Sequence, residues 1–246
     1  MKTKKVLIII PAYNEEKSIL SAVDSIRDYN RTAKSPYDYL VINDGSTDST
    51  ESILREHDIP HVTLQRNLGI GGAVRTGYRH ALKNDYDFAI QFDGDNQHDI
   101  LCAEAILAPL RSDSADLVIG SRFVKGNEDN EFYSSFARRT GIKLLSYLMR
   151  FKTGHTVLDT TSGFRAANRR MIEVFARRYP TEYPEPISTT EALLDGFRVV
   201  EVPVKRHART TGRSSIHGLK SIKYMTTVFA AVLTARKQSK RQKSSR

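Results

Sequence analysis

The chain has 246 residues, of which 39% are hydrophobic and 27% charged, with a net charge of +10 and one cysteine, Cys102. This length and composition predict a globular protein with one sizeable core, and the lone cysteine excludes an internal disulfide and fits a reducing compartment. No secretory signal is visible, and no apolar run reaches the roughly 20 residues of a membrane-spanning helix, so we expect a cytoplasmic protein.

The first half of the chain alternates short apolar runs, typical of buried strands, with segments of helical spacing. The expected strands are Val6 to Ile10, Tyr39 to Ile42, Val62 to Leu64, Phe88 to Phe92 and Leu117 to Ile119. The expected helices are Glu15 to Tyr29, one that begins at Ser46 to Thr50, Gly72 to Lys83, and Leu101 to Leu110. This order predicts an α/β fold with a mostly parallel central sheet flanked by helices.

The second half is less regular. Phe132 to Phe151 is basic and apolar with helical spacing, Val199 to Val204 is an expected strand, and Ile216 to Lys237 is an expected amphipathic helix. We therefore divide the chain into a domain over residues 1–215 and a C-terminal helix with a basic tail over residues 216–246.

The positive charge is concentrated in that C-terminal segment. Residues 216–246 contain eight basic residues and no acidic one, so the remainder is nearly neutral. Such a tail suits nucleic acid, an anionic membrane surface, or a disordered solubilising end. The near-neutral body and the absence of aromatic residues after Phe229 argue against nucleic acid. The helix itself either packs on the body or lies in a membrane interface, and a small integral membrane partner is a further route of recruitment.

Polar and acidic residues gather where the predicted strands end, at the edge where open α/β sheets bind ligands. After the strand that ends at Phe92, Asp93 and Asp95 flank a glycine, and Gln97 follows. Two such close carboxylates repel each other unless a cation lies between them, and this oxygen set suits Mg²⁺ or Mn²⁺. A solvated loop is the alternative interpretation.

The other loops at this edge have structural alternatives as well. Asn14 and Asp44 each suit a helix cap, while a carboxylate at the level of Asp44 also suits hydrogen bonds from a base or ribose. The glycine-rich stretch Asn67 to Ala73 allows close approach of the backbone to a ligand, but it lacks a dinucleotide or P-loop spacing.

Taken together, five segments resemble the nucleotide-sugar-binding half of family-2 glycosyltransferases with the GT-A fold. They are PAYNEE (11–16), VINDGSTDST (41–50), NLGIGGAVRTGY (67–78), QFDGDNQHD (91–99) and GSRF (120–123). Two later segments, DTTSGFRA (159–166) and GRSS (212–215), are similar to motifs of the dolichyl- or polyprenyl-phosphate sugar synthases, which extends the resemblance to about residue 225.

The resemblance implies roles for individual residues. Asp93, Asp95 and Gln97 would hold the metal ion. The nucleotide-sugar would contact Pro11, Ala12, Asn14, Glu16, Asp44, Gly71, Arg75, Asp93 and Gly94. The acceptor phosphate would meet Arg122, Arg165, Arg209, Arg213 and Ser214. The catalytic group would comprise Asp95, Asp159, Glu185 and Arg165.

The role of Glu185 depends on the acceptor. Counted back from Gly196, Glu185 falls where relatives that use hydroxyl acceptors keep a catalytic carboxylate. A sugar hydroxyl needs a general base, whereas a lipid phosphate is already an anionic nucleophile. Glu185 is therefore a base, a group that positions the acceptor, or a structural carboxylate, and Asp159 competes for the role of base.

The expected activity is inverting transfer from a UDP- or GDP-sugar to a polyprenyl phosphate, peripherally at the cytoplasmic face of the membrane. Three alternatives stay open: a glycosyltransferase that uses a saccharide hydroxyl, an Asp-x-Asp phosphatase, and a non-catalytic basic module. The phosphatases usually place their nucleophilic aspartate on the first strand, whereas the acidic pair here follows the fourth.

Overall fold

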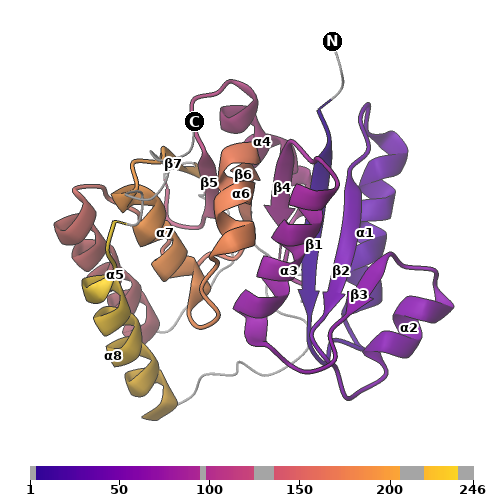
Figure 1. Ribbon diagram of the computed structural model, residues 1–246, viewed down its shortest axis with the longest axis horizontal. Coiled ribbons are helices and arrows are strands. Elements are labelled where there is room, and N and C mark those ends of the chain that lie inside the picture. The colour runs from indigo at the N-terminus through magenta and orange to yellow at the C-terminus, as the bar shows by residue number, and fades with distance from the viewer. Residues whose placement is uncertain (1–3, 95–97, 125–135, 206–218, 238–246) are drawn as a thin grey trace, which may run out of the picture.

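The computed structural model describes residues 4–94, 98–124, 136–205 and 219–237, which form a single α/β domain around a seven-stranded sheet (Figure 1). The strands are β1 (Val6–Ala12), β2 (Asp38–Asn43), β3 (His61–Thr63), β4 (Phe88–Gln91), β5 (Leu117–Ser121), β6 (Arg165–Asn168) and β7 (Val199–Pro203). Their order in the sheet is β3-β2-β1-β4-β6-β5-β7.

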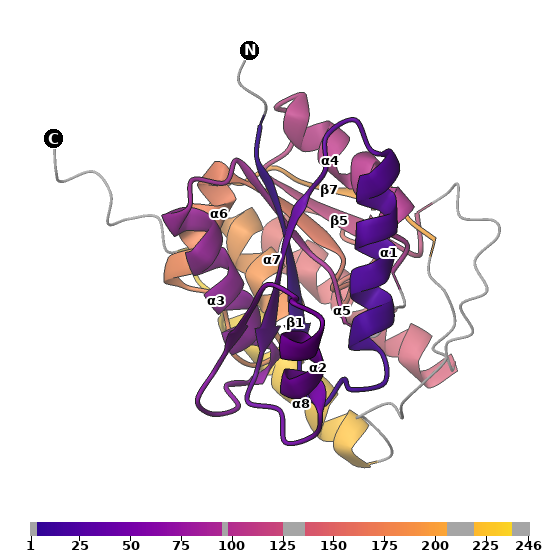
Figure 2. The same cartoon turned by 90° about the vertical axis from the view of Figure 1, so that its right-hand side faces the viewer.

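Helices cover both faces of the sheet. They are α1 (Ile19–Thr32), α2 (Thr50–Glu56), α3 (Gly69–Lys83), α4 (Ala103–Arg111), α5 (Phe136–Thr153), α6 (Arg169–Arg177), α7 (Pro184–Leu194) and α8 (Leu219–Thr234). In Figure 2, α1 and α4 lie on one side of the sheet, and α3 and α6 lie on the other. Helices α5 and α8 lie together at the β7 end of the molecule in Figure 1.

This two-sided cover explains the continuous apolar run of β1. Ile8 and Ile10 belong to the core beneath α1 and α4, whereas Leu7 and Ile9 belong to the core beneath α3 and α6. Alternate side chains of a strand point to opposite faces, so a strand buried on both faces must be apolar at every position.

The predicted mostly parallel sheet is confirmed, with one strand that the sequence analysis did not anticipate. Strand β6 is antiparallel to both of its neighbours, β4 and β5, and pairs Arg165 with Gln91 and with Ile119. Its four residues, Arg-Ala-Ala-Asn, lack the β-branched and aromatic residues that mark a strand. Helices α6 and α7 were not anticipated either.

The predicted start of the first helix was wrong. Helix α1 begins at Ile19 after the N-cap residue Ser18, and Asn14 has a left-handed backbone with φ of 55°. Asn14 therefore does not cap a helix, because it belongs to the preceding loop.

The C-terminal helix α8 packs on α5. The side chains of Val228 and Val232 are fully buried and contact Leu145 of α5, and the Lys152 ammonium donates to the Leu233 carbonyl oxygen at 2.6 Å. Of the two alternatives from the sequence, this arrangement matches the helix that packs on the body. Within the described part of the chain, no helix combines the length and the apolar character that crossing a bilayer requires.

Candidate functional site

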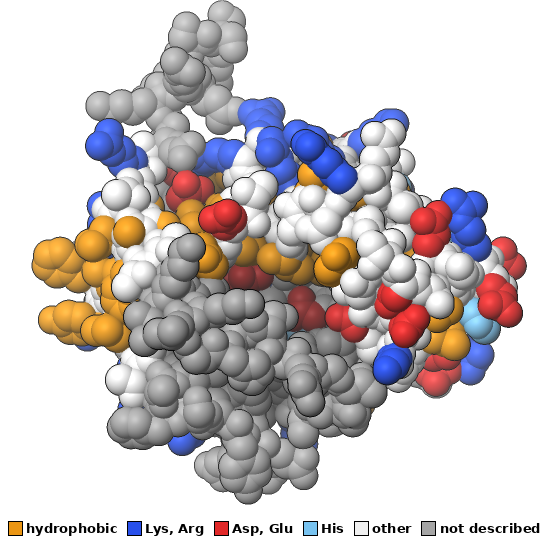
Figure 3. All heavy atoms as spheres, turned by 90° about the horizontal axis from the view of Figure 1, so that it is seen from below, with side chains coloured by type: hydrophobic (Ala, Val, Ile, Leu, Met, Phe, Trp, Pro, Cys, Tyr) orange, Lys and Arg blue, Asp and Glu red, His pale blue; other side chains and the backbone are white. Residues whose placement is uncertain are grey.

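The loops that follow β1, β2 and β4 meet at the carboxyl edge of the sheet. Figure 3 looks onto this edge from below and shows acidic side chains recessed in its middle, beside atoms that are not described. The ends of β1 and β4 are close, because a Cβ atom on Gly94 would lie 3.4 Å from the carbonyl oxygen of Pro11. The sequence-based prediction that these segments come together is therefore realised in the fold.

Reciprocal hydrogen bonds join the loops after β1 and β2. The Asn14 backbone N–H donates to Ser46 Oγ at 3.0 Å, and the Thr47 backbone N–H donates to Asn14 Oδ1 at 2.8 Å. The Ser49 N–H donates to Glu16 Oε2 at 3.1 Å. The side chains of Asn14 and Glu16, which were predicted to bind the nucleotide, thus join the two loops that form the rim of this edge.

Asp44 fastens this rim to the start of α3. Its side chain is buried beside Ala12, whose carbonyl oxygen accepts the Asp44 N–H at 2.8 Å, and Asp44 Oδ1 accepts the Leu68 N–H at 2.8 Å. Burial raises the pKa of the Asp44 carboxyl, against the opposing effect of the backbone N–H groups of Leu68 and Gly69. The hydrogen bond from the Leu68 backbone therefore accounts for a carboxylate at this position without a bound nucleotide.

Gly71 and Arg75, also predicted to bind the nucleotide, contact protein instead. A Cβ atom on Gly71 would lie 2.0 Å from the carbonyl oxygen of Pro180, so the chain after α6 approaches α3 too closely for any side chain. The Arg75 guanidinium donates to the carbonyl oxygens of Ala176 and Arg177 at the end of α6. In this arrangement both residues fasten α3 to α6, and their contact with a nucleotide stays a prediction.

The Asp93 carboxylate lies at the end of β4 between two neighbours to which the sequence analysis gave no role. Because a carboxylate only accepts, the imidazole Nε2–H of His98 donates to Asp93 Oδ2, at 3.1 Å. A Cβ atom on Gly163 would lie 2.5 Å from Oδ2 and 2.8 Å from Oδ1. Both residues belonged to recognised motifs, but their contact with Asp93 depends on packing between distant segments.

The His98 ring is itself held in place. It is 3% exposed and stacks on the Phe164 ring, with 5.1 Å between centroids and 18° between planes. Since Phe164 follows Gly163 directly, one short segment supports both the histidine and the carboxylate.

Glu185 lies in the first turn of α7, where its carbonyl oxygen accepts from Arg165 Nη2 at 3.0 Å. Burial raises its pKa, the Arg165 guanidinium opposes that rise, and the negative charge of Asp93 adds to it. The two carboxylates of Asp93 and Glu185 are thus close enough to repel each other. The residue before the helix, Tyr183, has a left-handed backbone with φ of 47°, which costs energy in a non-glycine residue.

The predicted metal ligands fit a hard divalent cation in their chemistry. Asp93 supplies one carboxylate, and Glu185 adds a second negative charge nearby. A divalent cation would offset the repulsion between them. Asp95 and Gln97 lie outside the described residues. Among those that are described, no three Asp, Glu, His or Cys side chains lie close enough to hold a metal ion.

Arg165 is fully buried, and its guanidinium is engaged by the protein. Its Nε donates to the Ser162 carbonyl oxygen at 2.7 Å, Nη1 to Ser188 Oγ at 3.0 Å, and Nη2 to the Glu185 carbonyl oxygen at 3.0 Å. The residue therefore anchors the first turn of α7, and this burial argues against direct contact with an acceptor phosphate.

Arg122 and Asp159, predicted to act separately, form a buried ion pair. Arg122 Nε and Nη2 donate to Asp159 Oδ2 and Oδ1 at 2.7 and 2.6 Å, and the side chains are 2% and 0% exposed. Glu201 accepts the Asp159 N–H at 2.8 Å and orients the segment. A carboxylate held in this way is a poor general base, and its partner has little freedom to bind a phosphate. The remaining predicted acceptor residues, Arg209, Arg213 and Ser214, lie outside the described residues.

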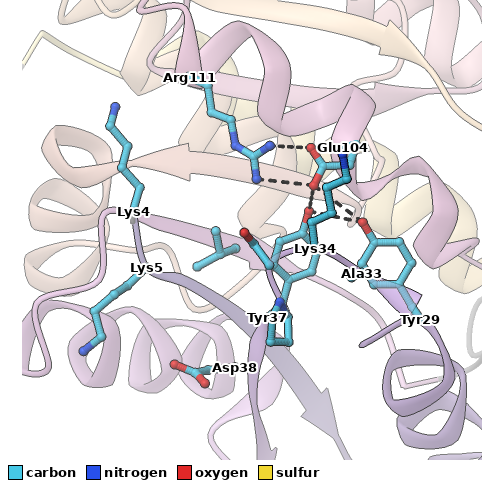
Figure 4. A pocket seen from close by; sticks show the side chains of 12 residues that line it. Lys4, Lys5, Tyr29, Ala33, Lys34, Tyr37, Asp38, Glu104 and Arg111 are labelled. Atoms are coloured by element: carbon cyan, nitrogen blue, oxygen red, sulfur yellow. Dashed lines mark hydrogen bonds and ion pairs between the residues drawn. The ribbon is translucent and has the colours of Figure 1, made fainter. Parts of the chain in front are cut away.

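A second hollow, of about 830 Å³, lies at the opposite edge of the sheet (Figure 4). Its central charges are already paired, because Glu104 accepts from both Arg111 and Tyr37. Tyr37 stacks on Tyr29, with 5.4 Å between ring centroids. The carboxyl edge is therefore the better candidate for the chemistry.

Solved structures confirm the fold. A glucosyl-3-phosphoglycerate synthase from Mycobacterium tuberculosis, in complex with phosphoglyceric acid, aligns with a TM-score of 0.68 at 23% identity, over 96% of this chain and 82% of its own. The same enzyme in complex with Mn²⁺, uridine diphosphate and phosphoglyceric acid aligns with the same TM-score at 22% identity, over 96% and 80%.

Several curated relatives have a higher sequence identity to this chain than these structures do. A UDP-N-acetylglucosamine–dolichyl-phosphate N-acetylglucosaminyltransferase of Methanococcus voltae is 30% identical over 83% of this chain and 86% of its own. A polyprenol monophosphomannose synthase of Mycolicibacterium smegmatis is 30% identical over 88% and 82%, and an undecaprenyl-phosphate mannosyltransferase of Micrococcus luteus is 32% identical over 87% and 88%. The family model for glycosyl transferase family 2 matches residues 7–175. The motifs, the sheet and these relatives agree: the chain belongs to glycosyl transferase family 2.

Proposed function

We propose that the chain transfers a sugar, with inversion, from a UDP- or GDP-sugar to a polyprenyl phosphate. The observation that carries the proposal is that one segment, Ser162 to Arg165, meets Asp93 at the end of β4 through Gly163 and meets Glu185 in the first turn of α7 through Arg165. The acceptor class is supported by three relatives at 30–32% identity that are named for sugar transfer to dolichyl, polyprenol or undecaprenyl phosphate.

In this proposal the hydrogen-bonded loops after β1 and β2 form the wall of the donor site. Their rigidity lowers the entropic cost of ordering a nucleotide there. Pro11, Ala12 and Gly94 bring backbone close to the ligand, while Asn14 and Glu16 act chiefly by fixing the loops to each other.

Asp93, Asp95 and Gln97 would hold Mg²⁺ or Mn²⁺. The ion would stabilise the negative charge that develops on the leaving nucleoside diphosphate. For this role the Asp93 carboxylate must keep one orientation, which the His98 hydrogen bond and the close approach of Gly163 favour.

With a lipid phosphate as nucleophile, the protein has no proton to remove. Arg209, Arg213 and Ser214 are the proposed phosphate contacts. Arg165 acts indirectly by fixing the start of α7, and the Arg122–Asp159 pair fixes the loop before β6. Glu185 then positions the acceptor instead of acting as a base.

A second candidate function is transfer to a saccharide hydroxyl. The observation that favours it is the raised pKa of Glu185, because a carboxylate with a raised pKa is a better general base near neutrality. Of the two carboxylates proposed for this role, Glu185 is preferred, since Asp159 is held by Arg122.

The test supplies UDP- and GDP-sugars, Mn²⁺ and a detergent-dispersed polyprenyl phosphate, and detects the glycosylated lipid by mass spectrometry. We expect product with one donor class and its loss in Asp93→Ala and Asp95→Ala proteins that retain the circular dichroism spectrum of the wild type. Normal turnover in a folded Asp95→Ala protein would contradict the metal assignment. Glu185→Gln separates the acceptors: turnover persists with a lipid phosphate and collapses with a hydroxyl acceptor.

We further propose that the chain works peripherally at the cytoplasmic face of the membrane. Residues 1–215 would carry the chemistry, and residues 216–246 would add α8 and the basic tail. Recruitment by a small integral membrane partner is the alternative to direct contact with anionic lipid.

A further inference from the structure

Helix α5 presents an uncovered apolar stripe. Leu144, Tyr147 and Phe151 are 54%, 70% and 79% exposed, and their spacing of three and four residues places them along one face of the helix. The opposite face is buried, since Leu145 and Met149 are 1% and 0% exposed. An exposed tyrosine and phenylalanine on one stripe are unusual for a surface that meets only water.

A further exposed apolar side chain lies on the neighbouring helix. Leu233 of α8 is 48% exposed, and its carbonyl oxygen accepts from Lys152 near the end of α5. Hydrophobic side chains project at the left of Figure 3, the side on which Figure 1 places α5 and α8. Both ribbon views place these two helices in the lower half of the molecule, toward the edge at which the parallel strands end.

Basic residues border the stripe. Arg139, Lys143 and Arg150 are exposed on α5, and the sequence from 136 to 153 contains no acidic residue. Lys143 and Arg150 lie four residues before and three residues after Tyr147, so each lies next to the stripe on the helix surface. The face therefore combines large apolar side chains with basic residues and no acidic ones.

We infer that this face of α5, together with Leu233, is the surface by which the protein docks on an anionic lipid membrane. A lipid interface offers an apolar layer for the stripe and negative head groups for the basic row. A second copy of the chain fits less well, because a symmetric contact through this face would bring its cations against those of the partner.

This inference changes which helix meets the lipid. The sequence pattern left open whether α8 is an interfacial helix, but its Val228 and Val232 pack on α5. Helix α8 thus supports α5 from behind and adds Leu233 at the margin. The inference rests on the proposed function, since a polyprenyl phosphate acceptor requires the site to reach a bilayer.

The test is flotation of the full chain with vesicles of phosphatidylcholine alone or mixed with phosphatidylglycerol. We expect binding to the mixed vesicles at low salt and partial release at high salt, because salt screens the attraction to head groups. The Tyr147→Ser/Phe151→Ser protein should lose its binding at either salt concentration. The Lys143→Glu/Arg150→Glu protein should bind the mixed vesicles at least about tenfold more weakly.

Control variants carry comparable changes elsewhere on the surface. Leu101 is 70% exposed on the turn before α4, so Leu101→Ser removes an apolar side chain outside α5. Lys34 and Lys83 are exposed beyond α1 and at the end of α3, so Lys34→Glu/Lys83→Glu reverses two charges away from the face. These proteins should bind the vesicles as the wild type does. Because all substituted side chains are exposed, circular dichroism should show unchanged folding throughout.

Three results would overturn the inference: no wild-type binding to mixed vesicles, unchanged binding by the Tyr147→Ser/Phe151→Ser protein, or a wild-type dimer that this change converts to monomer. Activity separates this inference from the proposed function. The Tyr147→Ser/Phe151→Ser protein should keep wild-type turnover with a short-chain, water-soluble prenyl phosphate and lose it with a long-chain acceptor in vesicles. If the wild type uses neither acceptor, the proposed function fails, whatever the flotation result.

Discussion

At the scale of single residues, the orientation of Asp93 depends on two neighbours, His98 and Gly163. The buried His98 imidazole donates to Oδ2, and the absence of a side chain at Gly163 leaves room for both carboxylate oxygens. Neighbours that fix a metal-binding carboxylate commonly matter almost as much as the carboxylate itself.

We predict that His98→Phe lowers Mn²⁺ affinity and turnover by about 10- to 100-fold, because the ring stack on Phe164 survives and the hydrogen bond to Asp93 is lost. Mn²⁺ binding can be followed by electron paramagnetic resonance, and folding by thermal denaturation. His98→Asn, which keeps a donor, should recover part of the affinity. Equal Mn²⁺ binding by wild type and His98→Phe would show that His98 only fills space.

A second prediction concerns pH. The Glu185 carboxyl has an ordinary pKa of 4.5, and burial raises this pKa in the folded state. The folded protein therefore binds more protons than the unfolded chain between the two values, so its stability falls as pH rises through that interval. Glu185→Gln removes this loss, and the variant should gain stability relative to the wild type between pH 4 and pH 8.

Urea denaturation of both proteins in metal-free buffer at the two pH values measures this difference. Glu16→Gln, a change in a carboxylate of the rim loops, provides a comparison away from the buried cluster. A stability difference between wild type and Glu185→Gln that does not grow with pH would mean that the Glu185 carboxyl is well solvated.

At the scale of elements, the Arg122–Asp159 pair joins the end of β5 to the segment that leads into β6. Replacing one partner leaves the other charge buried without its counter-charge. Asp159→Asn should therefore lower the free energy of unfolding by roughly 3–5 kcal/mol. The Arg122→Met/Asp159→Leu double variant should recover much of this loss, because it leaves no buried charge.

Chemical denaturation of the three proteins checks this prediction. The exposed pair between Arg31 and Asp28 serves as control, with Asp28→Asn expected to change stability by less than about 1 kcal/mol. If Asp159→Asn is no more costly than Asp28→Asn, the pair is solvated in solution.

The contact between α8 and α5 leads to a fourth prediction. Val232→Asp places a carboxylate in an apolar contact and should detach α8, which limited proteolysis would reveal as early cleavage within α8. Leu233→Asp changes the adjacent, half-exposed position and should leave the helix protected. Similar cleavage of both variants would show that α8 is not held by this contact.

At the scale of the whole molecule, the sequence predicted the strands and helices whose residues show a local hydrophobic pattern. The apolar run of β1 and the helical spacing of α3 were readable because each contacts the core with most of its residues. Strand β6 was not readable, since its Arg165 is an unlikely residue for the middle of a sheet until Ser162 and Ser188 are seen to satisfy it.

The candidate site divides in the same way. Asp93 and Glu185 were predicted from motif and spacing, and the fold brings them within electrostatic reach of each other. Their roles, and those of Asp95 and Gln97, stay predictions. The pairing of Arg122 with Asp159 could not be predicted, because it depends on side-chain directions across a separation of 37 residues.

The position of β6 also constrains the order in which the protein assembles. Strands β1 to β4 form a contiguous parallel block, so the first 91 residues contain all the partners that this block needs. Strand β5 is synthesised next but has no place beside β4, since β6 separates them and is made more than 40 residues later. The sheet is therefore completed by a late insertion, and such non-local pairing is slow to form. During synthesis the open side of β4 is an unpaired edge, and the acidic end of that strand acquires its final neighbours only when the gap closes.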